Sequence, residues 1–209
     1  MKKILLGTVA VFALTTAGAQ AQEYNSNGYD LGPYVGAYGG YGWSYDDVGG
    51  SDIGINGGDY GIYAGIEGDA LLDATINRVG LGLTGAIEAH YGWSSADDSV
   101  GAVEFEKDTE WGVSFKPGLK FLDNKLPLAA APYAILGYRN TEYDASANIG
   151  ALTVGGSETY HGFELGFGTE LLAYQDVGVR LEYTHVFYGE ENGFDPDEDN
   201  IRLGLGYHF

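Results

Sequence analysis

The sequence contains no cysteine, a single methionine, only five prolines and few basic residues, and these shortages exclude several classes of protein. Without cysteine an exported chain has no disulfide framework, so its stability must come from another source. With 10 Lys and Arg against 30 Asp and Glu, the chain lacks the basic face that nucleic-acid binding requires. Its aromatic content of 14% argues against disorder, because disordered acidic chains are poor in aromatic residues.

Long apolar runs are also missing after residue 21. The best candidate for a membrane helix, residues 126–136, is short and is interrupted by Pro127 and Pro132. A membrane-spanning helix needs about 20 predominantly apolar residues. We therefore expect no membrane helix in this part of the chain.

Residues 1–21 have the pattern of a signal peptide. Lys2 and Lys3 precede a short apolar segment, residues 4–14, and the segment 19–21 reads Ala-Gln-Ala, the small-x-small pattern of a cleavage site. We predict export and cleavage after Ala21. An uncleaved membrane helix is the alternative, but the apolar segment is too short to span a bilayer comfortably.

Cleavage would leave 188 residues, which is within the range of one domain. It would remove two of the ten basic side chains, and 8 basic and 30 acidic side chains would then give a formal charge of −22. Residues 22–31 are polar, and we expect them to form a short N-terminal linker. The domain itself is expected to comprise residues 32–209.

Strict alternation of apolar and polar residues, which is typical of a strand with two different faces, recurs along the chain. In residues 78–93 the odd positions are apolar and end in Tyr91 and Trp93, whereas the even positions are Gly, small polar or charged. Residues 201–209 repeat this pattern. Six further strands are predicted at residues 33–43, 60–67, 111–119, 128–139, 161–171 and 177–188. The facing of 33–43, rich in Gly and Tyr, and of 128–139, rich in Ala, is left open.

The connections between these strands alternate in length. Long acidic loops are predicted at 44–59, 94–109, 140–158 and 189–200. Shorter connections are predicted at 68–77, 122–127 and 172–176, of which 68–77 is unexpectedly long. Long loops on one side and short turns on the other are typical of outer-membrane barrels. The sequence therefore predicts an all-β fold, an eight-stranded antiparallel up-and-down transmembrane β-barrel.

A soluble β-sandwich is the alternative fold, because it would also produce alternating strands. Two features favour the barrel. Aromatic residues such as Tyr60, Trp111 and Tyr207 gather at strand ends, as in the aromatic girdles of membrane barrels. Glycine is frequent on the polar face, where a narrow lumen needs small residues.

Three segments resemble a known family. Residues 32–43 (GPYVGAYGGYGW) look like the first strand of the small OmpA/OmpX-like, opacity-type outer-membrane β-barrels, the porin-like outer membrane protein beta-barrel family. Residues 177–189 (VGVRLEYTHVFYG) look like their seventh strand. Residues 203–209 (LGLGYHF) resemble their C-terminal assembly signal, which implies that role for Tyr207 and Phe209.

The resemblance also implies a location and partners. It implies the outer membrane of a Gram-negative bacterium, contacts with outer-membrane lipid and lipopolysaccharide, and handling by periplasmic chaperones and the β-barrel assembly machinery. We expect a monomer that binds no nucleic acid.

Two motifs suggest chemistry that their context does not support. Residues 80–85 fit G-x-G-x-x-G, but that dinucleotide motif needs a helix to begin after the turn, and here the alternation continues to Trp93. Residues 195–200 superficially resemble a calcium loop but lack Gly at its sixth position and Glu at its twelfth. Carboxylates suit hard cations, so weak association of divalent ions is the alternative to a solvated loop, but we expect no cofactor and no dedicated metal site.

Catalysis deserves consideration because some small barrels are enzymes that modify lipid A. Such deacylases use a His and a Ser two residues apart on one strand, and no histidine of this chain has a Ser at that position. Nucleophile, base and orienting group cannot all be named. We therefore expect a protein that is not an enzyme.

Charged residues on the polar face are expected to fill the lumen. An eight-stranded barrel has an interior about wide enough for its own side chains, and buried charges must pair. The predicted luminal charge network comprises Glu67, Glu88, Lys116, Arg139, Glu164, Glu170, Arg180, Glu182 and Arg202. Glu110 shares this face, and Lys120 lies near a turn.

The sequence favours a non-enzymatic barrel that contributes to envelope integrity and presents acidic surface loops. Two alternatives remain open: a small porin or uptake channel, and a surface adhesin or antigen. Function in such proteins depends on loops that carry no readable motif.

Overall fold

The computed structural model describes residues 29–48, 51–76, 79–100, 103–123, 128–149, 152–173, 176–189 and 197–209. No helix within these ranges is long and apolar enough to cross a membrane. The predicted signal peptide lies outside the described residues. The first strand begins at Tyr29, three residues before the predicted start of the domain. The strands are β1 (Tyr29–Val48), β2 (Ser51–Ile76), β3 (Val79–Ser94), β4 (Asp97–Val100), β5 (Val103–Asp123), β6 (Leu128–Ile149), β7 (Leu152–Ala173), β8 (Val177–Tyr188) and β9 (Asp197–His208).

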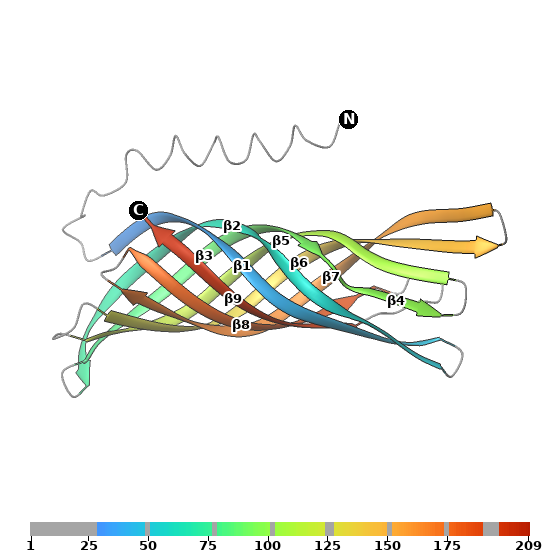
Figure 1. Cartoon of the computed structure of the whole chain (residues 1–209). Coiled ribbons are helices and arrows are strands. Elements are labelled where there is room, and N and C mark those ends of the chain that lie inside the picture. The colour runs from blue at the N-terminus through green and yellow to red at the C-terminus, as the bar shows by residue number, and fades with distance from the viewer. Residues whose placement is uncertain are drawn as a thin grey trace.

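The strands form one closed antiparallel barrel (Figure 1). β1 pairs with β2 on one side and with β9 on the other, so the sheet closes between the first and last strands. The short β4 follows β3 after Ser95 and Ala96 and pairs with β5, as β3 does, so the two act as one interrupted strand. The described chain is therefore an eight-stranded barrel, as predicted.

Alternate residues point into and out of the barrel. Along β8 and β9 the even positions are buried, among them Arg180 and Arg202, whereas Leu181 and Leu203 lie on the outside. Large apolar side chains cover the outer surface, so the polarity is inverted relative to a soluble protein. This arrangement is typical of an outer-membrane barrel and excludes the sandwich, whose apolar face would be buried.

The structure shows which residues face the lumen in the two strands, 33–43 and 128–139, whose facing the sequence left open. In β1 the buried positions include Tyr34 and Tyr38. In β6 they include Ala129, Ile135 and Arg139. Both strands therefore place aromatic, apolar and charged residues together in the lumen, which is why their sequences show little contrast between faces.

An aromatic girdle surrounds part of the outer surface. Tyr60 of β2 stacks on Trp93 of β3 with ring centroids 5.9 Å apart, and Trp93 also meets Tyr91 edge-on at 5.1 Å. Trp111 of β5 contacts Tyr138 of β6 at 5.9 Å. Aromatic rings of this kind favour the interface between lipid and water.

Several predicted connections are strands instead. Residues 68–76 continue β2 and pair with β3, with a register shift between Leu72 and Thr75, so the predicted turn at 68–77 is wrong. Most of the predicted loops 44–59, 94–109 and 140–158 also continue as paired strands. Outside the bilayer the outer face of a strand meets water and is no longer apolar, so the alternation weakens although the backbone ladder continues. The connections 122–127 and 172–176 are short, as predicted.

Glycines on the luminal face make room for tyrosine rings. A Cβ at Gly61 would lie 2.6 Å from the ring and hydroxyl of Tyr38, and one at Gly65 would lie 2.6 Å from those of Tyr34. Any larger residue at these positions would collide with the ring. Glycine therefore allows a barrel of this width to hold large side chains.

Candidate functional site

Charged residues line the lumen in three groups. A loop-end cluster lies at the end distant from the C-terminus, a central cluster lies at mid-barrel, and a terminus-end cluster lies beside the C-terminus. The loop-end cluster comprises Asp59, Lys107, Glu110, Arg139, Glu164, Glu198 and Arg202. The central cluster comprises Glu88, Lys116, Arg180 and Glu182. The terminus-end cluster comprises Glu67, Asp69, Lys120, Glu170 and His208.

The central cluster pairs two cations with two carboxylates. Lys116 Nζ donates to Glu88 Oε1 at 2.8 Å and to Glu182 Oε1 at 2.6 Å. Arg180 donates to both oxygens of Glu88, at 2.5 and 3.1 Å. Each charge is thus compensated by a partner on another strand, which is what permits it to be buried.

Tyrosines supply further donors to these carboxylates. The Tyr34 hydroxyl of β1 donates to Glu88 at 3.0 Å, and the Tyr133 hydroxyl of β6 donates to Glu182 at 2.7 Å. Hydrogen bonds to charged groups are the stronger kind, particularly away from water. The central cluster therefore ties five strands together across the lumen.

Lys107 is the centre of three carboxylates in the loop-end cluster. Its Nζ lies 2.5 Å from Glu198 Oε1, 3.0 Å from Glu110 Oε2 and 3.5 Å from Asp59 Oδ2. The side chain is 3% exposed, so the ammonium is buried in contact with its counter-ions.

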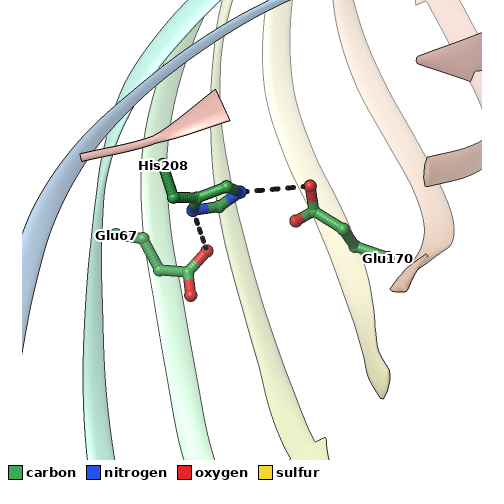
Figure 2. A group of neighbouring side chains, drawn as sticks. All are labelled: Glu67, Glu170 and His208. Atoms are coloured by element: carbon green, nitrogen blue, oxygen red, sulfur yellow. Dashed lines mark hydrogen bonds and ion pairs between the residues drawn. The ribbon is translucent and has the colours of Figure 1, made fainter. Parts of the chain in front are cut away.

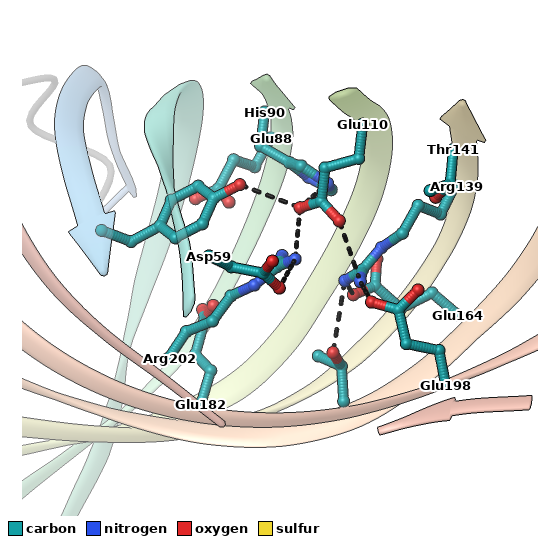
Figure 3. A network of polar contacts seen from close by, with 12 residues as sticks. Asp59, Glu88, His90, Glu110, Arg139, Thr141, Glu164, Glu182, Glu198 and Arg202 are labelled. Atoms are coloured by element: carbon teal, nitrogen blue, oxygen red, sulfur yellow. Dashed lines mark hydrogen bonds and ion pairs between the residues drawn. The ribbon is translucent and has the colours of Figure 1, made fainter. Parts of the chain in front are cut away.

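Arg139 is fully buried among carboxylates of other strands (Figure 3). It contacts Glu164 and donates to the Thr184 hydroxyl at 3.2 Å. It also lies 3.5 Å from Glu110 and 3.6 Å from Glu198. These contacts link the guanidinium to β5, β7, β8 and β9.

Glu110 is the most connected carboxylate of the loop-end cluster. Arg202 contacts its Oε1, to which the Tyr38 hydroxyl also donates at 2.9 Å. The His90 ring nitrogen lies 3.9 Å from the same oxygen. The Arg202 guanidinium lies 4.6 Å from the centre of the Tyr38 ring, a cation–π contact.

Lys107 and Glu198 lie beyond the aromatic girdle, outside the segments expected to cross the membrane. Burial opposes the charge on Lys107, but Glu110, Glu198 and Asp59 outweigh it and raise the pKa of Lys107 well above its usual value. Burial also opposes the charge on Glu198, yet Lys107 and Arg139 lower the pKa of this carboxyl. Both groups are therefore charged at neutral pH.

The structure places all nine residues of the predicted network inside the barrel. Eight are buried, and Glu67 is half-buried at the terminus end. Arg202 lies opposite Glu182 on the neighbouring strand, but its ion pairs run to Glu110 and Asp59. Tyr207 and Phe209 lie on the outer surface, where their rings meet edge-on at 5.1 Å.

Three members of the loop-end cluster were missed because they fall in segments predicted as loops. Asp59 and Glu198 continue the buried parity of their strands, so extending the alternation would have found them. Lys107 could not be found in this way. A register shift between Lys107 and Thr109 changes which positions face inward, so Lys107 and Glu110 are both buried although three residues apart.

The two apparent motifs have structural roles. Residues 80–85 lie within β3, and the strand continues through them without a helix, so the dinucleotide motif lacks its context. Of the acidic segment 195–200, the part from Asp197 onward belongs to β9, and Glu198 is engaged by Lys107. Its first two residues lie outside the described part of the chain.

A model of the family described as outer membrane protein beta-barrel domain matches residues 8–209. A search of the curated proteins finds no match to the sequence.

Solved structures show similar folds. Neisserial surface protein A is 18% identical, with a TM-score of 0.50 over 85% of this chain and 97% of that protein. A major outer membrane protein of Thermus thermophilus is 14% identical, with a TM-score of 0.49 over 85% and 99%. Ail, the attachment invasion locus protein of Yersinia pestis, is 14% identical, with a TM-score of 0.42 over 84% and 98%. At these identities the likeness is one of fold alone.

Proposed function

Because the chain belongs to the outer membrane protein beta-barrel domain family, we propose that it is a non-enzymatic barrel with a closed lumen. It is an outer-membrane protein, and in this proposal it contributes to envelope integrity and presents an acidic surface outside the cell. The same proposal includes export with cleavage after Ala21, transit with periplasmic chaperones, and insertion by the β-barrel assembly machinery. The inserted protein is then a monomer surrounded by lipid and lipopolysaccharide.

The packing of the lumen carries the proposal. The cavity between the central and loop-end clusters has a volume of about 10 Å³ and is lined by, among others, Glu88, His90, Lys116, Arg180 and Arg202. That volume holds about one water molecule. A solute could pass only if the ion pairs separated, and breaking a buried pair costs about 3–5 kcal/mol. The packing therefore favours a plug over a porin or uptake channel.

Planar-bilayer recording of the refolded protein tests the closed lumen. We expect no steady current in the parent, with any opening brief and small. Arg139→Ala is the variant to compare with the parent, because it removes the fully buried guanidinium from the lumen. If ions can pass through the lumen at all, this variant should conduct. A steady, ion-selective current in the parent would favour the channel instead.

Contacts of the four histidines support a non-enzymatic role. His90 lies beside Glu110, His161 contacts Tyr138 and Asn140, His185 contacts Asp199, and His208 contacts Glu170. None of these contacts within the described residues brings a Ser or Thr hydroxyl to a histidine, as a nucleophile–base pair would require.

The contribution to envelope integrity can be measured in the producing bacterium. Deleting the gene should increase sensitivity to bile salts and to large antibiotics that an intact outer membrane excludes. The parent sequence should restore resistance, and so should a variant lacking the outer part of β6 and β7. If the deletion strain is as resistant as its parent, the envelope role is wrong.

A surface-binding role is the second candidate, and the length of the strands favours it. β6 and β7 remain paired as far as Ile149 and Leu152, well beyond the aromatic girdle, and carry exposed acidic residues such as Asp144 and Glu158. A preformed acidic sheet can recognise a cationic partner with little loss of conformational entropy. The test is the binding of the producing bacteria to a cationic host surface. Loss of this binding when the hairpin is shortened, with the envelope still intact, would support this candidate.

A further inference from the structure

Three potential metal ligands meet at the terminus end of the lumen. Glu67 of β2, Glu170 of β7 and His208 of β9 point toward one another, with the imidazole between the two carboxylates (Figure 2). His208 Nε2 lies 3.2 Å from Glu170 Oε1, and Nδ1 lies 4.0 Å from Glu67 Oε2. One ligand atom from each residue lies within 4.8 Å of the other two.

The charges around this site do not balance. Lys120 Nζ lies 3.3 Å from Glu67 Oε1 and also contacts Asp69. With Glu170, three carboxylates face one ammonium, which leaves two negative charges when His208 is neutral. Glu67 Oε2, the oxygen nearer His208, is the one not engaged by Lys120. A divalent cation would compensate the excess.

A buried hydroxyl beside the site is without a hydrogen-bond partner. Tyr63 is 3% exposed, and its hydroxyl has no partner in the structure. A Cβ at Gly206 would lie 2.6 Å from this hydroxyl, while one at the opposite residue, Gly178, would collide with the Glu170 carboxylate. The hydroxyl and the Glu170 carboxylate therefore lie over two directly paired residues of β9 and β8, and the hydroxyl can offer a further oxygen to a water at the site. An unsatisfied buried hydroxyl is costly, so its position needs a cause.

The imidazole is held in place but remains reachable. The Tyr34 ring stacks on the His208 ring, with centroids 5.1 Å apart and planes inclined by 18°. The side chains of Glu67 and His208 are each 14% exposed at the mouth of the barrel. An ion can therefore enter from the C-terminal end of the barrel, and the stacked ring and the ion pairs already bring the ligands together.

The other cluster of carboxylates in the described chain lacks this capacity. Asp59, Glu110 and Glu198 could also offer three oxygens, but the Lys107 ammonium already lies among them at 2.5–3.5 Å. A lysine thus takes the place of a cation at the loop end. At the terminus end Lys120 lies to one side, on Glu67 and Asp69.

We propose that Glu67, Glu170 and His208 bind a divalent transition-metal ion, with Zn²⁺ as the best match. One imidazole and two carboxylates suit Zn²⁺, whereas Mg²⁺ prefers six oxygens, including several waters. Tetrahedral Zn²⁺ ligands lie about 3.3 Å apart, so the present spacing needs a contraction of roughly 1.5 Å at most. A water would supply the fourth ligand, and the Tyr63 hydroxyl is the nearby group without a partner that could bond to it.

The position of the site gives the ion a mechanical role. Its ligands come from β2, β7 and β9, so the ion links strands on different sides of the barrel and holds the residue before the C-terminal Phe209. Binding only to the folded barrel raises its stability in proportion to the logarithm of ion concentration. Zinc in the periplasm would then stabilise the barrel at the end that closes with its last strand.

Calorimetric titration of the refolded protein with ZnCl₂ at pH 7.5 tests the site, with MgCl₂ as the comparison ion. We expect one Zn²⁺ per barrel, and binding at least tenfold weaker in Glu67→Gln, Glu170→Gln and His208→Gln. His161→Gln is the matched control, because it removes an exposed outward-facing histidine from β7 and should leave the affinity unchanged. The melting temperature of the parent should rise with Zn²⁺ and not with Mg²⁺.

If His208→Gln does not refold, the two glutamate variants and the shift of the His208 ring signals of the parent on Zn²⁺ addition decide the matter. The proposal is overturned if the parent binds no Zn²⁺, or if the glutamate variants bind it as tightly as the parent. Equal loss of affinity in His161→Gln would also overturn it. In each of these cases the His208 imidazole would bridge Glu67 and Glu170 as a charged partner and would not be a metal ligand.

Discussion

Individual charges in the lumen depend on partners from distant parts of the sequence. Glu110 contacts Arg202, Lys107, Arg139 and Tyr38, which lie on β9, β5, β6 and β1. Removing one member of such a group leaves the other charges buried without compensation, which costs more than the lost contact itself. Each luminal charge therefore contributes to stability through several neighbours.

Arg180→Ala should destabilise the barrel by about 3–5 kcal/mol, because it leaves Glu88 with only part of its compensation. The free energy of unfolding in urea, measured in lipid vesicles, tests this. Arg180→Met combined with Glu88→Gln removes both charges of the pair and should recover part of the loss. If Arg180→Ala alone is as stable as the parent, Arg180 is not part of a tightly coupled network.

Leu83→Arg and Leu203→Arg should each cost about 2–4 kcal/mol if these outward residues lie near the bilayer midplane. Both side chains lie on the apolar outer surface. The same unfolding assay measures the cost, and Leu83→Ala is the control that shortens the side chain without adding charge. If Leu83→Arg folds into lipid as stably as Leu83→Ala, the outer face of β3 does not meet lipid.

At the scale of the strands, the last one closes the barrel. β9 pairs with both β8 and β1, and the Phe209 backbone N–H donates to the Pro33 carbonyl at 3.0 Å. Its ring lies on the outside against Tyr207. The end of β9 is thus held by backbone pairing, while its aromatic side chains face outward.

Deletion of Phe209 should reduce insertion into the outer membrane and leave aggregated or degraded protein in the periplasm. The reason is that the ring completes the apolar face of the strand that resembles an assembly signal. The amount of heat-modifiable barrel in outer-membrane fractions measures the effect. Phe209→Tyr keeps an aromatic ring and should insert nearly as the parent does, and normal insertion of the deletion variant would contradict the role.

On the scale of the whole molecule, the barrel combines a lipid-facing part with a paired sheet that extends beyond it. The extension of β6 and β7 is a ladder from Asn140 and His161 to Ile149 and Leu152. The inner part of this ladder belongs to the lumen, because Thr141 shares a hydrogen bond with the Tyr188 hydroxyl and Tyr143 donates to Glu198. The part beyond Asp144 and Ser157 pairs within the hairpin and with β5. This outer part, residues 145–156, should therefore be separable from the rest of the barrel.

Replacing residues 145–156 by Asn-Gly should leave the thermal stability of the barrel nearly unchanged. Asp144 and Ser157 face each other, so a two-residue turn can join them. Tyr143 and Tyr160, which meet edge-on at 5.6 Å, are retained. Heat-modifiable migration and melting temperature check this, and failure of the shortened protein to refold would show that the hairpin is needed for assembly.

The sequence by itself determined the eight-stranded barrel and the facing of its most regular strands. This is possible because alternation is a local property, and a strand between lipid and a polar lumen must show it strongly. It also determined that the charged residues from Glu67 to Arg202 would meet inside, since eight strands enclose too little space to leave them apart.

Only the tertiary structure decided which of those charges pair and how far the strands extend. Pairing across the lumen depends on closure and register, which bring Glu110 to Arg202 although 92 residues separate them. Because the register shifts between Lys107 and Thr109, counting alternate positions along the sequence cannot show that Lys107 faces the lumen. Beyond the girdle the outer face of a strand meets water, while the inner face still buries charged residues such as Lys107 and Glu198. Both faces are then polar, so the hydrophobic contrast weakens and the sequence does not show where the backbone ladders of β2, β6 and β7 end.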